Sequence, residues 1–309
     1  MKKIIIVLTV LMISLAINVL LLFQSQNQSQ DNTTTFTKQE QKYPLLSKRI
    51  LNDFPNDLLI NFSPLRSDLK TKVADYGQDF GFYFEYLPTG TSIGVNSTQE
   101  FAALSLLKVP IVMAYFHQKE VLNKGNEVIT VTQDELDKAF GSLWEKGAGY
   151  RISLDQTAKL AITDSDNTAL RVLTDHIQKK YFDDVYSGLD INLQTGDNGV
   201  ILTARSYSSI LKALYFSSLL KKDNSQLVLN YMTQTKFSDK LPAGIPGNIQ
   251  VAHKVGIYQN QLFTDCGIVY IPRRPYLLCM VSNSDDVTAR ERMITVSKTV
   301  YDYVANADK

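Results

Sequence analysis

The sequence predicts an α+β fold with an antiparallel sheet. Segments with helical periodicity lie in the middle of the chain and at both ends of its globular part, whereas extended segments form one early and one late group. A parallel sheet would require strands and helices that alternate, because a crossover between parallel strands usually carries a helix. This chain has no such alternation, so its strands are expected to pair antiparallel.

The early part of the globular region predicts one helix and one hairpin. Residues 63–77, SPLRSDLKTKVADYG, place Leu65, Leu69 and Val73 on one helical face, and a glycine ends the segment. Residues 79–96, DFGFYFEYLPTGTSIGVN, contain an aromatic-rich run, a Pro-Thr-Gly turn signal and a second extended run. This pattern is typical of a β-hairpin.

The middle of the chain is predicted to be helical. A long apolar stretch runs from Ser105 to Val121, and Ser153 stands where it can cap a later helix that follows a glycine-containing loop. Residues 206–224, SYSSILKALYFSSLLKKDN, form a further amphipathic helix and its end.

Three short extended runs and a helix complete the chain. The runs are NIQVAHKVGIYQNQ, LFTDCGIVYIP and YLLCMVSNS, and the turns between them predict separate strands. Residues 285–307 follow as an amphipathic helix. The apolar side of this helix comprises Val287, Met293, Val296, Val300 and Val304.

The N-terminal segment differs in composition from the rest. Ile4–Phe23 is an uncharged run of twenty residues, long enough to cross a bilayer, and no small-residue cleavage pattern follows it. Two lysines precede the run, which predicts a cytoplasmic N-terminus and an extracytoplasmic remainder. Residues 24–42 are rich in Gln, Asn, Ser and Thr, as in a flexible linker. We therefore expect a membrane anchor at 1–23, this linker, and one folded domain at 43–309.

Composition limits the class of protein. Hydrophobic residues make up 44% of the 309 residues and charged residues 20%, as in an ordinary globular domain. The formal net charge is +1 and no cluster of Lys and Arg recurs, which argues against a nucleic-acid partner, because such partners bind through neutralised phosphates. Cys266 and Cys279 lie on neighbouring extended runs. A disulfide formed outside the cell and two buried free thiols both fit this placement.

A Ser-x-x-Lys spacing is the first candidate for a catalytic pair. It occurs four times, starting at Ser67, Ser105, Ser209 and Ser218. The spacing alone therefore selects no nucleophile, and Ser67 falls on the outer face of a predicted helix. Residues three apart on a helix share a face, so Lys108 can reach Ser105. A lysine made partly neutral by burial can accept the proton that a nucleophilic serine loses.

Two further motifs follow Ser105 in order. Ser165-Asp166-Asn167 comes sixty residues later, and Lys254-Val255-Gly256 heads a late extended run. With its Ser-x-x-Lys, Ser-Asp-Asn and Lys-x-Gly motifs, the chain resembles class A β-lactamases and penicillin-binding proteins. The resemblance covers nearly the whole domain and includes the FAALSLLKVP, SDNTA, LPAGIP and DCGIVYIP segments.

The resemblance implies a five-stranded antiparallel sheet with the N- and C-terminal helices on one face and a mainly helical lobe on the other. It implies that Ser105 is the nucleophile, that Lys108 is its base, and that Ser165 passes a proton to the leaving nitrogen. Asp166 would hold its loop to the scaffold. No cofactor or metal is expected.

The resemblance also implies the substrate-binding groups. Asn167 would hydrogen-bond the substrate amide, and Lys254 would both depress the pKa of the catalytic lysine and bind the substrate carboxylate. The backbone N–H groups of Ser105 and Ile257, which follows Gly256, would form an oxyanion hole.

The chain departs from the class A pattern in two places. Class A enzymes use a Glu on the Ω loop to activate the water that releases the acyl group, and no Glu lies in the corresponding segment here. Its last part, SGLDINLQTGDNGVI, has only Asp190 and Asp197 as carboxylates, for which a substitute base and a turn-forming role are the two interpretations. Val255 replaces the usual Ser or Thr, and no Arg follows on the next strand.

These observations predict a penicillin-recognising serine acyl-hydrolase. It forms an acyl-enzyme at Ser105 with β-lactams or with D-Ala-D-Ala-like stem peptides of peptidoglycan, and it releases the acyl group slowly. Two alternatives stay open: an efficient β-lactamase that hydrolyses β-lactam antibiotics, and a non-catalytic receptor for cell-wall fragments or β-lactams that kept the fold. We expect a monomer at the cell membrane, anchored through residues 4–23, with its domain outside the cytoplasm.

Overall fold

The computed structural model describes residues 60–192, 194–196 and 199–307, which all belong to one compact unit. The predicted anchor and linker lie outside the described residues. Within the described part of the chain, no helix combines the length and the hydropathy that crossing a bilayer requires.

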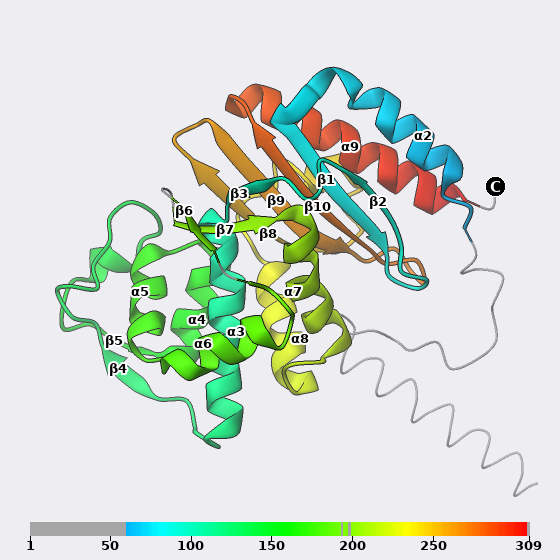
Figure 1. The fold of residues 1–309 in the computed structure, drawn as a ribbon. Coiled ribbons are helices and arrows are strands. Elements are labelled where there is room, and N and C mark those ends of the chain that lie inside the picture. The colour runs from blue at the N-terminus through cyan, green and yellow to red at the C-terminus, as the bar shows by residue number, and fades with distance from the viewer. Residues whose placement is uncertain (1–59, 193, 197–198, 308–309) are drawn as a thin grey trace, which may run out of the picture. The chain divides into compact units, whose positions relative to one another are not determined.

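Five antiparallel strands form the central sheet in the order β2-β1-β10-β9-β8 (Figure 1). They are β1 Phe80–Tyr86, β2 Thr91–Val95, β8 Val251–Tyr258, β9 Leu262–Val269 and β10 Tyr276–Asn283. The early hairpin joins the late strands where β1 pairs with β10, which brings segments almost 200 residues apart into one sheet. Strand β8 is therefore an edge of the sheet.

Two helices from opposite ends of the described chain cover one face of this sheet (Figure 1). They are α2 Ser63–Lys72 and α9 Asp286–Asn306. Leu65 and Leu69 of α2 and Met293 of α9 are fully buried with the aromatic side chains of β1. Each such burial contributes roughly 1.5–3 kcal/mol, so this cluster is a main source of stability.

The expected apolar side of the terminal helix is confirmed except at its first member. Val296, Val300 and Val304 are fully buried, as predicted, but Val287 is 65% exposed. Val287 lies in the first turn of α9, ahead of the part of the helix that packs on the sheet.

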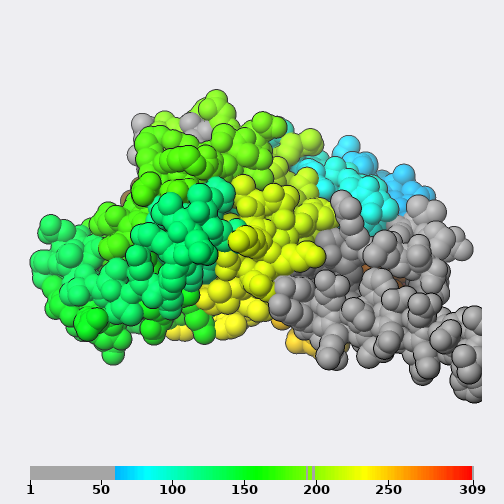
Figure 2. Space-filling view, turned by 90° about the horizontal axis from the view of Figure 1, so that it is seen from below, coloured from blue at the N-terminus to red at the C-terminus, as the bar shows by residue number. Residues whose placement is uncertain are grey.

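A mainly helical lobe lies on the other side of the sheet (Figure 1). Its helices are α3 Lys108–Val121, α4 Leu154–Thr163, α5 Asn167–Asp175, α6 Lys179–Ser187, α7 Ala204–Phe216 and α8 Lys222–Met232. As predicted, Ser153 caps α4, and its Oγ accepts a hydrogen bond of 3.2 Å from the Gln156 N–H. In the space-filling view, the green residues of the lobe and the yellow residues beside them form one continuous surface (Figure 2).

Two short sheets brace the lobe. One has the order β3-β7-β6, with β3 Glu100–Ala102, β6 Gln194–Gly196 and β7 Gly199–Thr203. The other pairs β4 Val128–Thr130 with β5 Arg151–Ser153. Strand β3 leads directly into the segment that carries Ser105, so the first of these sheets fixes the chain just before the candidate nucleophile.

Two predicted helix boundaries are corrected by the structure. The helix expected from Ser105 begins as a short 3₁₀ turn, Leu104–Leu107, and becomes α-helical only at Lys108. The amphipathic segment at 206–224 ends as a helix at Phe216, because Ser217 takes a left-handed conformation with φ of 51° and terminates it.

The two cysteines form a disulfide. Cys266 on β9 and Cys279 on β10 are direct cross-strand partners. Cys266 also lies opposite Lys254 on β8, so the bond links the two strands immediately behind the strand that carries this lysine.

Candidate active site

Ser105 lies on the 3₁₀ turn in front of α3. The turn is fixed from the N-terminal side, where the Ala103 N–H donates a 2.8 Å hydrogen bond to the Val200 carbonyl of β7. Leu104 has a φ of 51°, a left-handed conformation that turns the chain sharply before the serine. Side chains three apart eclipse each other in a 3₁₀ turn, so Ser105 and Lys108 project from the same side.

Lys108 is buried at the first position of α3 and is only 1% exposed. Its Nζ donates hydrogen bonds to the Ser165 backbone carbonyl, to Ser165 Oγ at 3.1 Å and to Asn167 Oδ1 at 2.7 Å. Burial lowers the pKa of Lys108 to about 8, although the carboxylates of Asp166 and Asp137 act in the opposite direction. At pH 7 about a tenth of Lys108 is then uncharged and able to accept a proton.

The Ser165 hydroxyl stands between two lysines. Lys254 Nζ donates to Ser165 Oγ at 2.9 Å, on the side opposite the contact from Lys108. Ser165 has a φ of 53°, which presents its side chain at the junction between α4 and α5. Lys254 is fully buried, and desolvation together with the nearby Lys108 charge holds its pKa well below the ordinary value.

Asp166 holds the loop around the Ser-Asp-Asn motif. Its side chain is fully buried, caps α5 by accepting from the Ala169 N–H at 2.8 Å, and accepts from the backbone N–H groups of Ser142 and Leu143 at 2.7 and 2.8 Å. Gly141 has a φ of 88°, and a Cβ there would lie 2.1 Å from the Asp166 carboxylate, so only glycine fits. All of these contacts are structural.

The open edge of β8 faces the candidate nucleophile. The Val255 carbonyl accepts a 2.9 Å hydrogen bond from Lys254 Nζ, so the backbone groups of Val255 point away from β9. Backbone directions repeat every second residue of an antiparallel strand, so the Ile257 N–H points to the same open edge. A Cβ added to Gly256 would lie 3.5 Å from the Ser105 nitrogen, which shows how closely the two backbones approach. Two backbone N–H groups are thereby brought to one place.

The site described so far joins four side chains from three separate segments. Lys108, Ser165, Asn167 and Lys254 form one hydrogen-bonded cluster in which every lysine proton donor meets a serine, an amide or a carbonyl. The model of the beta-lactamase enzyme family matches residues 64–304. The chain belongs to this family. It is a serine hydrolase with the β-lactamase fold, as the motif order implied.

Solved structures of the same fold share less than a quarter of the sequence. PBP-A is 23% identical with a TM-score of 0.72, and the match covers 80% of this chain and 99% of that one. The TLA-3 extended-spectrum β-lactamase is 17% identical with a TM-score of 0.73, over 80% and 100% of the two chains. A β-lactamase from Sphaerobacter thermophilus is 18% identical with a TM-score of 0.71, over 80% and 98%. No curated protein matches by sequence.

The two departures from the class A β-lactamase pattern have different structural settings. Val255 lies opposite Asp265 and is 3% exposed, on the face of β8 away from the Lys254 side chain. Asp190 is exposed in a left-handed turn after α6, and the carboxylates that act on Lys108 do not include it. The turn-forming interpretation fits Asp190. Asp197 lies outside the described residues.

The structure adds side chains that no sequence motif marks. The rings of Phe140 and Phe237, from two different loops, lie 5.7 Å apart between centroids, and the Phe237 ring lies 5.9 Å from Lys254 Nζ. Asp137 approaches Asn167, with 3.4 Å between Asn167 Nδ2 and Asp137 Oδ1. Only the chain fold brings these loops to the motif residues. An aromatic residue shortly before a Ser-Asp-Asn motif would have been a weak signal at best.

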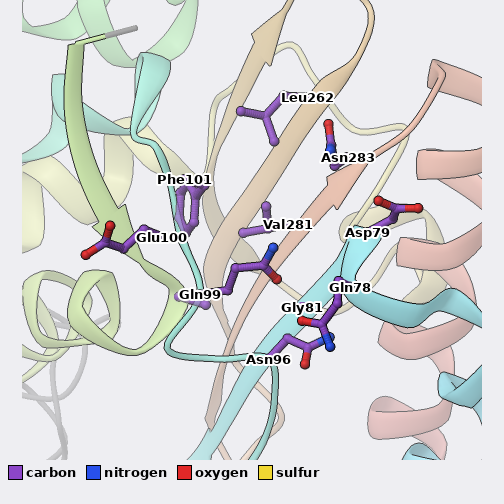
Figure 3. A pocket seen from close by; sticks show the side chains of 11 residues that line it. Gln78, Asp79, Gly81, Asn96, Gln99, Glu100, Phe101, Leu262, Val281 and Asn283 are labelled. Carbon is purple, nitrogen blue, oxygen red and sulfur yellow. The ribbon is translucent and has the colours of Figure 1, made fainter. Parts of the chain in front are cut away.

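A separate pocket of about 180 Å³ lies where β1, β9 and β10 meet β3. Phe101, Leu262 and Val281 gather at its centre, with Asp79 and Asn283 on one side (Figure 3). None of the motif residues lines it, so it is distinct from the candidate active site of this β-lactamase family member.

Proposed function

We propose that this protein is a penicillin-recognising enzyme in which Ser105 forms an acyl-enzyme with β-lactams or with D-Ala-D-Ala-like peptides. The observation that carries the proposal is the Ser165 hydroxyl held between Lys108 and Lys254 beside the Ser105 turn. Burying two ammonium groups costs desolvation free energy. A binding module has no use for that cost, whereas a proton-transfer site does.

Acylation follows from the positions of these groups. Neutral Lys108 takes the proton of Ser105 Oγ, and the oxygen lone pair forms a bond to the substrate carbonyl carbon. The carbonyl oxygen becomes an anion that the Ser105 and Ile257 N–H groups stabilise. As the C–N bond breaks, Ser165 gives its hydroxyl proton to the leaving nitrogen and regains one from protonated Lys108, which returns the base to its neutral form.

Two side chains orient the substrate in this scheme. Lys254 supplies a cation for the substrate carboxylate, and Asn167 Nδ2 binds the carbonyl of the amide next to the reacting bond. The lysine contact to Asn167 Oδ1 leaves the Nδ2 end of the amide for this task. Because Val255 brings no hydroxyl, the carboxylate has fewer partners than in class A β-lactamases with Ser or Thr there.

Release of the acyl group is proposed to be slow. Hydrolysis of an acyl-enzyme needs a base that activates water. Among the described residues, the carboxylates acting on Lys108 are Asp166, which is occupied by backbone N–H groups, and Asp137, which is paired with Arg171. A crystal structure of a mutant of PBP-A, 23% identical over 79% of this chain, is an acyl-enzyme complex with penicillin G.

We also propose that residues 1–23 anchor the protein in the cell membrane and that 43–309 is the extracytoplasmic domain. The Cys266–Cys279 disulfide supports an oxidising compartment. A protease-protection assay on intact cells would test this placement, since a cytoplasmic domain would survive external protease.

The acylation proposal is tested by incubating the purified protein with labelled penicillin G. We expect one label per chain, absent in Ser105→Ala and retained in Ser67→Ala, which alters an exposed serine with the same Ser-x-x-Lys spacing. Rapid repeated turnover of a chromogenic cephalosporin would favour the efficient β-lactamase instead. Binding of peptidoglycan fragments that Ser105→Ala leaves unchanged, with no label on the wild type, would favour the receptor.

A further inference from the structure

The Asn167 amide lies between two groups of opposite charge. Lys108 Nζ donates to its Oδ1 at 2.7 Å, and Asp137 Oδ1 lies 3.4 Å from its Nδ2. An ammonium group only donates hydrogen bonds and a carboxylate only accepts them. Both neighbours therefore favour the same orientation of the amide and disfavour the flipped one.

Asp137 is itself held firmly. Its side chain accepts a 2.8 Å hydrogen bond from the Ala139 N–H and pairs with Arg171 Nη2 at 2.8 Å. Its backbone N–H donates to Thr168 Oγ1 at 2.8 Å, and that hydroxyl donates back to the Asp137 carbonyl at 3.2 Å. Thr168 and Arg171 belong to the same helix as Asn167, so the carboxylate is attached to the helix whose first residue it contacts.

The Asp137 carboxylate stays charged in this setting. Its partial burial raises the pKa, but the Ala139 N–H, the Asn167 amide and Arg171 together outweigh this and lower it. Its side chain is 16% exposed, so its field on the neighbouring amide is only partly screened by water.

We propose that Asp137 is a positioning residue that fixes the Asn167 amide with an N–H directed at the acylamido carbonyl of the substrate, and so selects substrates that carry this group. The inference rests on the proposed function. Nδ2 has two protons, and with one directed at Asp137 the other remains for the substrate. Asp137 touches no reacting atom, so it acts through Asn167 alone.

The experiment compares two β-lactams that differ in the acylamido group. Penicillin G carries it, and 6-aminopenicillanic acid does not. For Asp137→Ala, we expect the second-order acylation constant to fall about tenfold with penicillin G and to change less than about threefold with 6-aminopenicillanic acid. Asp137→Asn keeps an oxygen that accepts from Asn167, so it should retain most of the penicillin G rate.

A second readout distinguishes positioning from a loss of folded structure. The Asp137 charge raises the pKa of Lys108, so both variants should move the acidic limb of the acylation profile to lower pH. Asp134→Ala, an exposed change on the same loop, should alter neither the rate nor the limb. Urea midpoints measured alongside separate any general loss of stability.

Three results would overturn the inference. These are equal losses with both β-lactams, a wild-type rate in Asp137→Ala, or no rescue by Asp137→Asn at an unchanged urea midpoint. If penicillin G does not acylate the wild type at all, the proposed function fails rather than the role of Asp137.

Discussion

The Ser165 hydroxyl accepts hydrogen bonds from Lys108 at 3.1 Å and from Lys254 at 2.9 Å. Two ammonium groups that share one acceptor in a buried site raise each other's cost of being charged. The arrangement therefore favours loss of a proton from one of the lysines and gives Ser165 a proton source on each side. Four predictions follow from this cluster and from the scaffold around it.

Acylation should depend on the ionisation of Lys108. Burial lowers the pKa of Lys108 to about 8, and only the neutral lysine can act as a base. The acylation constant with penicillin G should therefore rise with pH and level off above about pH 8. Lys108→Arg, which stays protonated, should lose about 10²–10⁴-fold. A rate that is flat between pH 6 and 9 would rule out this lysine as the base.

Lys254 should act through the substrate carboxylate. Lys254→Gln removes a buried cation while keeping hydrogen-bonding capacity toward Ser165. We expect penicillin G to bind about 10–100-fold more weakly, because a charge-assisted hydrogen bond is lost. The methyl ester of penicillin G has no carboxylate and is the control, since its binding should change far less. Equal losses for acid and ester would show that Lys254 does not contact the carboxylate.

Asp166 should matter mainly for stability. Asp166→Ala removes a helix cap and leaves the buried N–H groups of Ser142 and Leu143 without their acceptor. Together these losses cost about 3 kcal/mol of unfolding free energy, measurable by urea denaturation. The matched control is Asp285→Ala, which removes the exposed cap of α9 and should shift the midpoint much less. Similar shifts for both variants would contradict the structural role of the Asp166 contacts.

The disulfide should stabilise the sheet without taking part in catalysis. Cys266 and Cys279 are 13 residues apart, and closing a loop of that size restrains the unfolded chain by about 3 kcal/mol. The double variant Cys266→Ala, Cys279→Ala should lower the urea midpoint and keep the acylation constant at a temperature where it stays folded. A folded variant with a much lower acylation constant would show that the bond also positions Lys254 through the neighbouring strand.

The parts of the fold that the sequence predicts best have a local signal. The early hairpin, the three late strands and the cap at Ser153 each depend on neighbouring residues, and each is present in the structure. The end of α7 has no such signal, because Leu219 and Leu220 continue an apolar pattern beyond it. Ser217 ends the helix, and Leu220 is buried from a loop instead.

The same distinction holds for the site. The residues of the three motifs were identified from their order, and the structure brings Lys108, Ser165 and Lys254 into contact. Asp137 and Phe237 were not identified, because their neighbourhood is created by loops folding against α5 and β8. The direction of the Ile257 N–H likewise follows from the pairing of β8 as an edge strand, which no motif contains.

The central claim is that Ser105 becomes covalently acylated and stays so. Its most direct test is mass spectrometry of the intact protein after a short exposure to penicillin G, followed by trypsin digestion and fragmentation of the peptide 73–108, which contains Ser105. The account predicts one penicilloyl group on Ser105 that persists long after free penicillin is removed. A protein that carries no adduct, or that carries it on another residue, would contradict the account.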